Sequence, residues 1–243
     1  MTVTWEEAGW ERVAAGVGRC RLPVWDCTAG LVAGADAVLV IDAGSSPAEG
    51  ARLREQAHSL TGRRVTHLAL THPHFDHVFG TAAFPDAEVF AAVGVDTVLT
   101  RLRDREELAA DAERNGLAED VAREAAGRLA APRHLVSGEW TLDLGGGCQV
   151  LLANVGPGHT AYDLAVLVPG DPEVVFCGDL VEESGEPQAG PDAVPSRWPA
   201  ALDRLLALGG EDALYVPGHG AVVDAAFVRA QRDALTARFG VSP

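Results

Sequence analysis

The hydrophobic pattern of the chain consists of short apolar or alternating runs, separated by glycine, proline and polar residues. Runs of this length are typical of β-strands, because a period of two places every second side chain on the same face of a sheet. In the first part of the sequence they occur at 13–23, 24–32, 35–41, 65–70 and 88–91. Ser46 and Pro47 have the character of a helix N-cap and a first helical position, which predicts a helix over 47–59.

Residues 94–131 have a different pattern, rich in Ala, Leu, Arg, Glu and Asp and without alternation. This pattern predicts two helices that are interrupted at Asn115 and Gly116. Because helices with many charges usually present them to solvent, we expect an exposed helical pair. A wall of a binding site or a dimer contact is the alternative interpretation.

Strand-like runs return after residue 133, together with two helical stretches. They predict strands at 134–136, 140–144, 149–155, 163–168, 174–177 and 213–216, and helices at 198–208 and 225–238. Strands followed by helices thus occur twice, with no sequence repeat and no obvious linker. We therefore expect one domain, residues 1–243, that carries a helical insertion at about 94–131.

Charge and composition narrow the partners of the chain. The 35 acidic residues exceed the 19 basic ones, which gives a formal charge of −16, and every basic residue is Arg. Nucleic acids and anionic membranes attract basic surfaces, so both are disfavoured, and we expect a small-molecule substrate and a monomer or homodimer. The sequence has no signal-like start, no apolar run near the roughly 20 residues of a membrane helix, and no Cys-x-x-Cys pair. We therefore expect a cytoplasmic protein with free thiols.

A dense group of imidazoles and one carboxylate follows the strand predicted at 65–70. His72, His74, Asp76 and His77 fall within six consecutive residues. Neutral imidazole and carboxylate are ligands that zinc and iron accept, and such groups would be costly to bury without partners. A polar, His-rich loop without metal is the alternative, but the density of ligand-type residues favours a metal site.

Three further ligand-type residues share one placement. His159, Asp179 and His219 each stand just beyond the carboxyl end of a short apolar run and beside a glycine. Ligands from separate strands can converge at the edge of a packed sheet and be held rigidly there. Glycine permits the close approach of backbone and ligand, because it has no Cβ. These residues extend the predicted metal site across most of the sequence.

The order H-x-H-x-D-H, then a His in a G-H-T turn, an Asp and a last His resembles the pattern of the metallo-β-lactamase superfamily of metal-dependent hydrolases. The resemblance extends over about residues 10–225. It implies an α/β fold, the αββα sandwich, in which two mixed β-sheets are flanked by helices and the metals lie at one edge between the sheets. We therefore expect an enzyme of the metallo-hydrolase type.

The same resemblance implies a dinuclear site with two Zn²⁺ ions, for which Fe or Mn are alternatives. The first ion would be bound by His72, His74 and His159. The second would be bound by Asp76, His77 and His219, and Asp179 would bridge both ions. A hydroxide shared by the ions would attack a substrate carbonyl, and Asp76 would orient it. Thr160 and Asp163 are candidate acceptors for the second N–H groups of the ligand imidazoles.

Departures from the family pattern narrow the range of expected substrates. Glyoxalase II-like members use basic residues for the glutathione moiety, whereas this chain has no Lys. β-Lactamases of the superfamily often have a Cys in place of Asp179 and a cation nearby, whereas Glu182 and Glu183 follow here. We therefore expect a glyoxalase II- or lactonase-like hydrolase of a small thioester, lactone or ester, and weak β-lactam hydrolysis is one alternative. The other alternative is a mononuclear iron oxidoreductase similar to persulfide dioxygenases. Glu182 and Trp198 are candidate pocket residues.

Overall fold

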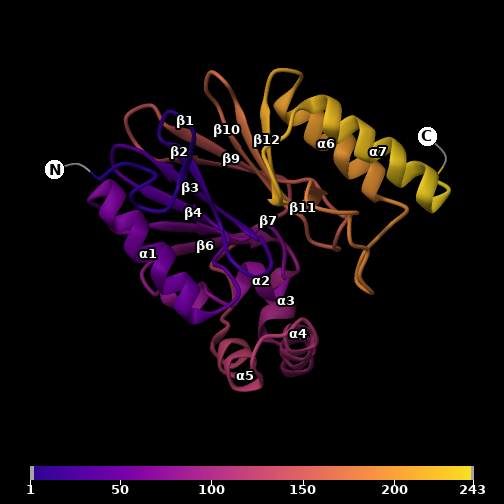
Figure 1. Ribbon diagram of the computed structural model, residues 1–243, viewed down its shortest axis with the longest axis horizontal. Coiled ribbons are helices and arrows are strands. Elements are labelled where there is room, and N and C mark those ends of the chain that lie inside the picture. The colour runs from indigo at the N-terminus through magenta and orange to yellow at the C-terminus, as the bar shows by residue number, and fades with distance from the viewer. Residues whose placement is uncertain (1–2, 242–243) are drawn as a thin grey trace.

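Two β-sheets pack face to face and carry helices on their outer sides (Figure 1). The computed structural model describes residues 3–241. The larger sheet has seven strands in the order β1 to β7, and the smaller has five in the order β12-β11-β10-β9-β8. Both sheets are mixed, since β4 and β5 pair in parallel in the first and β11 and β12 in the second. The fold is the αββα sandwich that the sequence predicts.

The elements have the following bounds. The larger sheet contains β1 (Glu11–Ala14), β2 (Val17–Arg21), β3 (Thr28–Ala33), β4 (Val38–Ile41), β5 (His67–Ala69), β6 (Glu88–Ala92) and β7 (His134–Val136). The smaller contains β8 (Glu139–Asp143), β9 (Gln149–Asn154), β10 (Leu164–Val168), β11 (Val174–Glu182) and β12 (Leu214–His219). The helices are α1 (Pro47–Thr61), α2 (Phe75–Val78), the 3-10 turn η1 (Thr81–Ala83), α3 (Val95–Thr100), α4 (Leu102–Arg114), α5 (Glu119–Arg128), α6 (Trp198–Gly209) and α7 (Ala225–Phe239).

Strand β10 shows why the apolar runs of the smaller sheet are continuous. Leu164, Val166 and Val168 point into the core between the two sheets. The alternate residues Ala165 and Leu167 point into a second core, which α6 and α7 cover (Figure 1). Because both faces of the strand are buried, both sets of positions must be apolar.

Helix α1 begins and ends where the sequence indicates. The Ser46 hydroxyl accepts a hydrogen bond from the backbone N–H of Glu49 at 3.2 Å, and Pro47 occupies the first turn. Gly62 closes the helix with φ at 67°. The predicted helix over 47–59 is therefore confirmed, and it runs two residues further.

Two of the strands predicted near the N-terminus are wrong in detail. The run 13–23 is a hairpin rather than one strand, because Gly16 at φ 70° turns the chain between β1 and β2. The run 24–32 becomes a strand only at Thr28. Before it, Val24 and Asp26 have positive φ angles of 81° and 61°, which no strand accommodates.

The stretch 94–131 forms three helices instead of the predicted two. Arg101 has extended backbone angles, with ψ at 130°, and this separates α3 from α4. The predicted break at 115–116 is confirmed, since α4 ends at Arg114. All four cysteines are free thiols, as expected. Across residues 3–241, no helix has both the length and the apolar character that crossing a membrane would require.

Candidate metal centre

The ligand-type residues converge at one edge of the sandwich, where strands of both sheets end. They come from the loop after β5 (His72, His74), from α2 (Asp76, His77), from the β9–β10 loop (His159), from β11 (Asp179) and from the end of β12 (His219). Two details differ from the sequence prediction. The stretch expected to be a loop after β5 contains the single helical turn α2, and β11 continues past Asp179 to Glu182.

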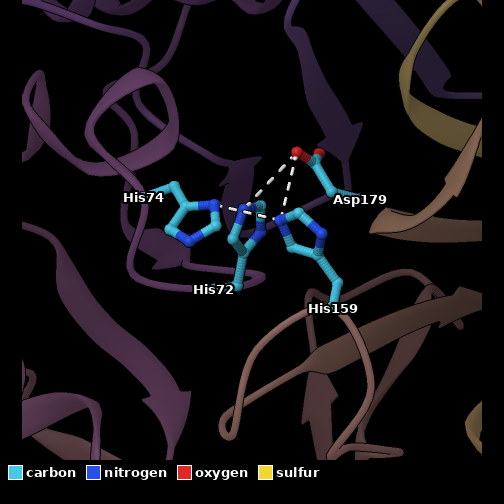
Figure 2. A group of neighbouring side chains, drawn as sticks. All are labelled: His72, His74, His159 and Asp179. Carbon is cyan, nitrogen blue, oxygen red and sulfur yellow. Dashed lines mark hydrogen bonds and ion pairs between the residues drawn. The ribbon is translucent and has the colours of Figure 1, made fainter. Parts of the chain in front are cut away.

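Asp179 and three imidazoles form the first group, and in Figure 2 dashed lines join the Asp179 carboxylate to His72 and His159, and His74 to His159. The Nε2 atoms of His72 and His159 lie 3.6 Å and 3.5 Å from Asp179 Oδ2. The His74 Nδ1 atom lies 3.0 Å from His159 Nε2. One ligand atom from each of these four side chains falls within 4.8 Å of the others, which is the spacing of a metal-binding group.

A second group shares Asp179 with the first. His77 Nε2 lies 3.1 Å from Asp179 Oδ1, and His219 Nε2 lies 3.2 Å from Asp179 Oδ2. Asp76 Oδ2 lies 3.4 Å from His219 Nε2 and 3.6 Å from His77 Nε2. The buried thiol of Cys27 lies beside this group, with Sγ 3.7 Å from the His77 ring nitrogens. The arrangement therefore has two sets of ligand atoms with one carboxylate common to both.

A glycine allows the central carboxylate to lie where it does. Gly218 is in β12, next to Asp179 in β11, and a Cβ added to it would fall 1.8 Å from Asp179 Oδ1. No side chain is compatible with that distance, so this Gly is required for the close approach of strand and ligand.

The second nitrogen of each imidazole has its own partner, which determines which nitrogen faces the centre. Three of these contacts are to side-chain oxygens: His72 Nδ1 to Thr71 Oγ1, His74 Nε2 to Asp192 Oδ2 and His77 Nδ1 to Asp42 Oδ2. The other two are to backbone carbonyls: His159 Nδ1 to that of Gln188 and His219 Nδ1 to that of Trp25. The distances run from 2.7 to 3.0 Å. This is the arrangement by which proteins orient metal-binding imidazoles.

Asp42 is a supporting residue that the sequence reasoning missed. Its carboxylate accepts hydrogen bonds from the Thr71 backbone N–H at 2.8 Å and from the Thr71 hydroxyl at 2.7 Å, in addition to facing His77. It is 2% exposed and has φ at 59°, a conformation that costs a non-glycine residue roughly 1–3 kcal/mol. The signal was present, because a carboxylate directly after the apolar run 35–41 occupies the same strand-end placement as the ligands.

Thr160 and Asp163, expected to accept from imidazoles, bond to each other instead. The Thr160 backbone N–H and hydroxyl donate to the Asp163 carboxylate at 3.0 Å and 2.7 Å. Both side chains are buried, and burial raises the pKa of Asp163 to about 7. The pair therefore fixes the backbone of the turn that carries His159.

The two predicted pocket residues have different environments. At the end of β11, Glu182 lines an open cavity that adjoins the candidate metal centre, and it accepts a hydrogen bond from the Gln188 backbone N–H at 3.1 Å. Trp198 is fully buried, and it packs edge-on against His159 at 5.3 Å between ring centroids while its indole N–H donates to the Leu180 carbonyl. Trp198 thus packs against the buried side of His159 and is not among the residues that line the cavity.

In the first group the electrostatics favour neutral His72 and His159 beside an ionised Asp179, whereas the pKa of His74 is raised, because Asp192 outweighs the effect of burial. Burial holds the pKa of His72 well below its usual range and lowers that of His159 to about 4. Although burial opposes ionisation of Asp179, His219 and His77 hold its pKa well below the usual range. Neutral imidazole and ionised carboxylate are the protonation states that bind metal.

The second group has a strong preference for positive charge. Burial opposes protonation of His219, but Asp179 and Asp76 nevertheless raise its pKa to about 12. Burial and the nearby Asp179 raise the pKa of Glu182 to about 7, and a cation beside this carboxyl would favour its ionised form. The same negative field that holds a proton on His219 would hold a metal cation in place of that proton.

Two buried atoms test whether a metal fits these residues. His72 Nε2 and Asp179 Oδ1 are inaccessible to solvent and have no hydrogen-bond partner among residues 3–241. Leaving such an atom unsatisfied costs about 1–3 kcal/mol, more where the group is charged. His72 Nε2 belongs to the first group, and Asp179 Oδ1 lies beside His77 of the second. A cation in each group would satisfy these atoms, so the residues present fit a metal.

An open cavity of about 940 Å³ adjoins the centre. His74, Asp76, His159, Asp179 and His219 form part of its lining, so the candidate metal centre is accessible to a small molecule. The other walls come from α4, from the β2–β3 and β9–β10 loops, and from residues 184–192. A cavity of this size is in the range of small-molecule sites.

Comparisons with known proteins agree with this fold. The sequence profile of the metallo-beta-lactamase superfamily matches residues 22–219, and the chain belongs to that superfamily. A Xenopus laevis protein named metallo-beta-lactamase domain-containing protein 1 is 31% identical over 160 residues, which are 64% of this chain and 54% of that protein. The chain thus spans about half the length of the curated relative it matches.

Solved structures confirm the fold. A metallo-beta-lactamase from Pontibacter korlensis is similar with a TM-score of 0.72 and 20% identity, covering 93% of this chain and 98% of that one. The metallo-beta-lactamase FIM-1 from Pseudomonas aeruginosa, solved in its mono-zinc form, has a TM-score of 0.69 and 18% identity, with 96% of each chain covered. At these identities the likeness concerns the fold alone.

Proposed function

We propose that the protein is a di-zinc hydrolase that cleaves the acyl bond to sulfur or oxygen in a small thioester, lactone or ester. Superfamily membership and the ligand-type cluster support a metal-dependent hydrolase in general terms. The observation that supports the finer proposal is the shared carboxylate of Asp179. Its Oδ2 lies 3.2–3.6 Å from His72, His159 and His219, and its Oδ1 lies 3.1 Å from His77, so imidazoles of both sets meet it. A single metal would leave one of these sets unused.

Each ion would have three ligands of its own and the common carboxylate. The first set is His72, His74 and His159, and the second is Asp76, His77 and His219. Bound there, two divalent ions would supply Lewis-acid activation of water and of the substrate carbonyl. Hydrolysis replaces the acyl bond to sulfur or oxygen with a bond to the oxygen of water, and the leaving group takes up a proton.

Asp76 is the residue we expect to position the attacking water. It is buried to 7% exposure, yet it lines the cavity, and its Oδ2 lies 3.4 Å from His219. A carboxylate placed at the boundary between ligands and cavity can accept a hydrogen bond from water and hold it toward the substrate.

The cavity favours a substrate without a carboxylate of its own. Within the described part of the chain, Arg114 is the one guanidinium in its lining, and this Arg is bonded to Asp111 at 2.9 Å. The lack of a free cation supports thioesters, lactones and esters over β-lactam antibiotics, and it supports small molecules over polyanions.

Metal content and turnover test the proposal together. Protein purified without added metal should contain zinc, and the zinc-loaded form should hydrolyse at least one member of a panel of thioesters, lactones, esters and β-lactams. Chelation should abolish that activity, and zinc should restore it. One iron and no zinc per chain would contradict the proposal in favour of a mononuclear iron oxidoreductase.

A further inference from the structure

The wall that α4 contributes to the cavity is acidic. Asp104, Glu107, Leu108 and Asp111 line the cavity, at spacings of three, four and seven residues along the helix. Positions with this spacing lie on one face of an α-helix, so three carboxylates flank one leucine along the wall. The insertion expected to be an exposed pair thus presents one of its faces to the cavity.

Few positive charges neutralise this wall. Among residues 3–241, Asp104 has no ion-pair partner. Glu107 pairs with Arg103 and Asp111 with Arg114, but these side chains are 41–85% exposed, and ion pairs in such positions are weak. The carboxylates of α4 therefore remain available to a cation in the cavity.

The end of β11 adds another acidic group to the same cavity. Glu182 is 6% exposed and lines the cavity, and the described residues give its carboxylate a backbone N–H from Gln188 but no guanidinium. A buried carboxylate without a cationic partner is costly, and a cation in the cavity would lower that cost.

Aromatic side chains complete the lining. Trp25, Phe75 and Tyr162 all border the cavity, and the rings of Trp25 and Phe75 meet edge-on with centroids 5.3 Å apart. An ammonium group over an aromatic face gains about 0.5–2 kcal/mol, and proteins recognise alkylammonium ligands by such faces. Carboxylates together with aromatic rings are the chemistry that binds an organic cation, whereas an anion would find repulsion on most sides.

We propose that this cavity selects substrates that carry an ammonium group in addition to the acyl bond that is hydrolysed. The ammonium would lie against the acidic face of α4, where Asp104, Glu107 and Asp111 line the cavity, and the carbonyl would face Asp76. The identity of the reaction rests on the proposed function, whereas the preference for a cation does not depend on turnover.

Equilibrium binding tests the preference independently of catalysis. Choline and 3,3-dimethylbutan-1-ol have the same shape but differ in charge, and both can be titrated into the zinc-loaded full chain by calorimetry. We expect choline to bind about tenfold more tightly or better, and the difference to shrink as salt is raised. Equal affinities for the two compounds would overturn the proposal.

Two matched variants locate the effect on α4. Asp104→Asn should weaken choline binding about three- to tenfold and leave the neutral alcohol unchanged. Glu106→Gln removes a carboxylate from the same helix, but its side chain is exposed and does not line the cavity, so it should leave both affinities unchanged. Equal effects of the two variants would show only a general charge effect and would contradict a cation site at this wall.

Kinetics separate this inference from the proposed function. Acetylthiocholine should have a kcat/KM about tenfold or more above that of its neutral analogue S-(3,3-dimethylbutyl) thioacetate, mainly through KM. If neither is hydrolysed but choline still binds preferentially, the proposed function fails and the cation site stands. If both are hydrolysed equally and the binding pair shows no difference, the cation site fails and the hydrolase stands.

Discussion

The floor of the cavity and its α4 wall are built in opposite ways. The floor consists of the ligand-type side chains from strand ends and from α2, which are mostly buried, and a second hydrogen bond orients each of its imidazoles. The wall consists of exposed or half-buried carboxylates on one helix, held by weak ion pairs or by none among the described residues. The comparison suggests that the floor determines the reaction and the wall determines the substrate, so changes in the two regions should have different consequences.

The largest effect should come from the residue common to both metal sets. Asp179→Asn keeps the shape but removes the charge that faces His72, His77, His159 and His219. We expect bound zinc to fall below two per chain and kcat/KM to fall by more than about 100-fold, beyond the loss typical of supporting residues. Elemental analysis and kinetics measure both, with the exposed Asp86→Asn as control. Wild-type zinc content in Asp179→Asn would contradict the shared-ligand arrangement.

Loss of the Trp198 side chain, which packs against His159, should mainly lower the stability of the fold. Trp198→Ala removes a fully buried indole and its bond to the Leu180 carbonyl, so the free energy of unfolding should fall by about 3–5 kcal/mol. Denaturant unfolding measures this change, and Trp198→Phe should show a smaller loss. A variant with altered substrate preference and unchanged stability would instead place Trp198 in the pocket.

Asp42 should act on the metal through His77. Asp42→Asn keeps the volume but weakens the bonds to the imidazole and to Thr71, and we expect zinc affinity to fall about 10–100-fold. Competition with a chromophoric chelator measures the affinity, while circular dichroism checks the fold. The matched control is Asp36→Asn, an exposed carboxylate just before the same strand. Equal zinc affinity in both variants would remove Asp42 from the supporting role.

The two metal sets should respond differently to pH. His159 has a pKa of about 4 and is already neutral at pH 5.5, whereas His219, with its pKa raised to about 12, must release a proton to bind a metal. In the first set only His74 has a raised pKa, whereas in the second set both His77 and His219 do. Lowering the pH should therefore weaken metal binding more steeply at the second set, by about tenfold per pH unit for each proton that must be released. Zinc titrations at pH 8 and pH 5.5 test this difference. Parallel loss at both sets would contradict it.

The smallest effect should come from the exposed Arg114–Asp111 ion pair of α4. Arg114→Ala breaks an exposed ion pair with Asp111, so the free energy of unfolding should change by less than about 1 kcal/mol. Its removal leaves Asp111 unneutralised, which should improve choline binding two- to threefold, on the order of one weakened surface ion pair. Calorimetry of choline binding checks the direction, and weaker binding would argue against the cation site.

The sequence revealed the floor because its residues are of rare type and regular placement. His159, Asp179 and His219 each combine a ligand-type side chain with an apolar run and an adjacent glycine, His72 follows the apolar run 65–70, and the sheets bring these positions together. Asp42 has the same strand-end placement, but it lies outside the motif pattern, and its contact with His77 depends on the packing of β4 against β5.

The wall could not be predicted from the sequence in the same way. The charged pattern of 102–114 is compatible with any exposed helix, and which face meets the cavity depends on how α4 packs against α2, α3 and α5. Trp198 and the Thr160–Asp163 pair illustrate the same limit. Their residue types allowed a role at the pocket or at an imidazole, and tertiary packing assigned them to supporting the loop and turn near His159.

Anomalous diffraction from crystals of the zinc-loaded protein would test the central claim most directly. We predict two zinc peaks about 3.5–4 Å apart, the first beside His72, His74 and His159 and the second beside Asp76, His77 and His219. The carboxylate of Asp179 should contact both. A single peak at full zinc occupancy, or zinc bound away from Asp179, would contradict the dinuclear centre and the hydrolytic function inferred from it.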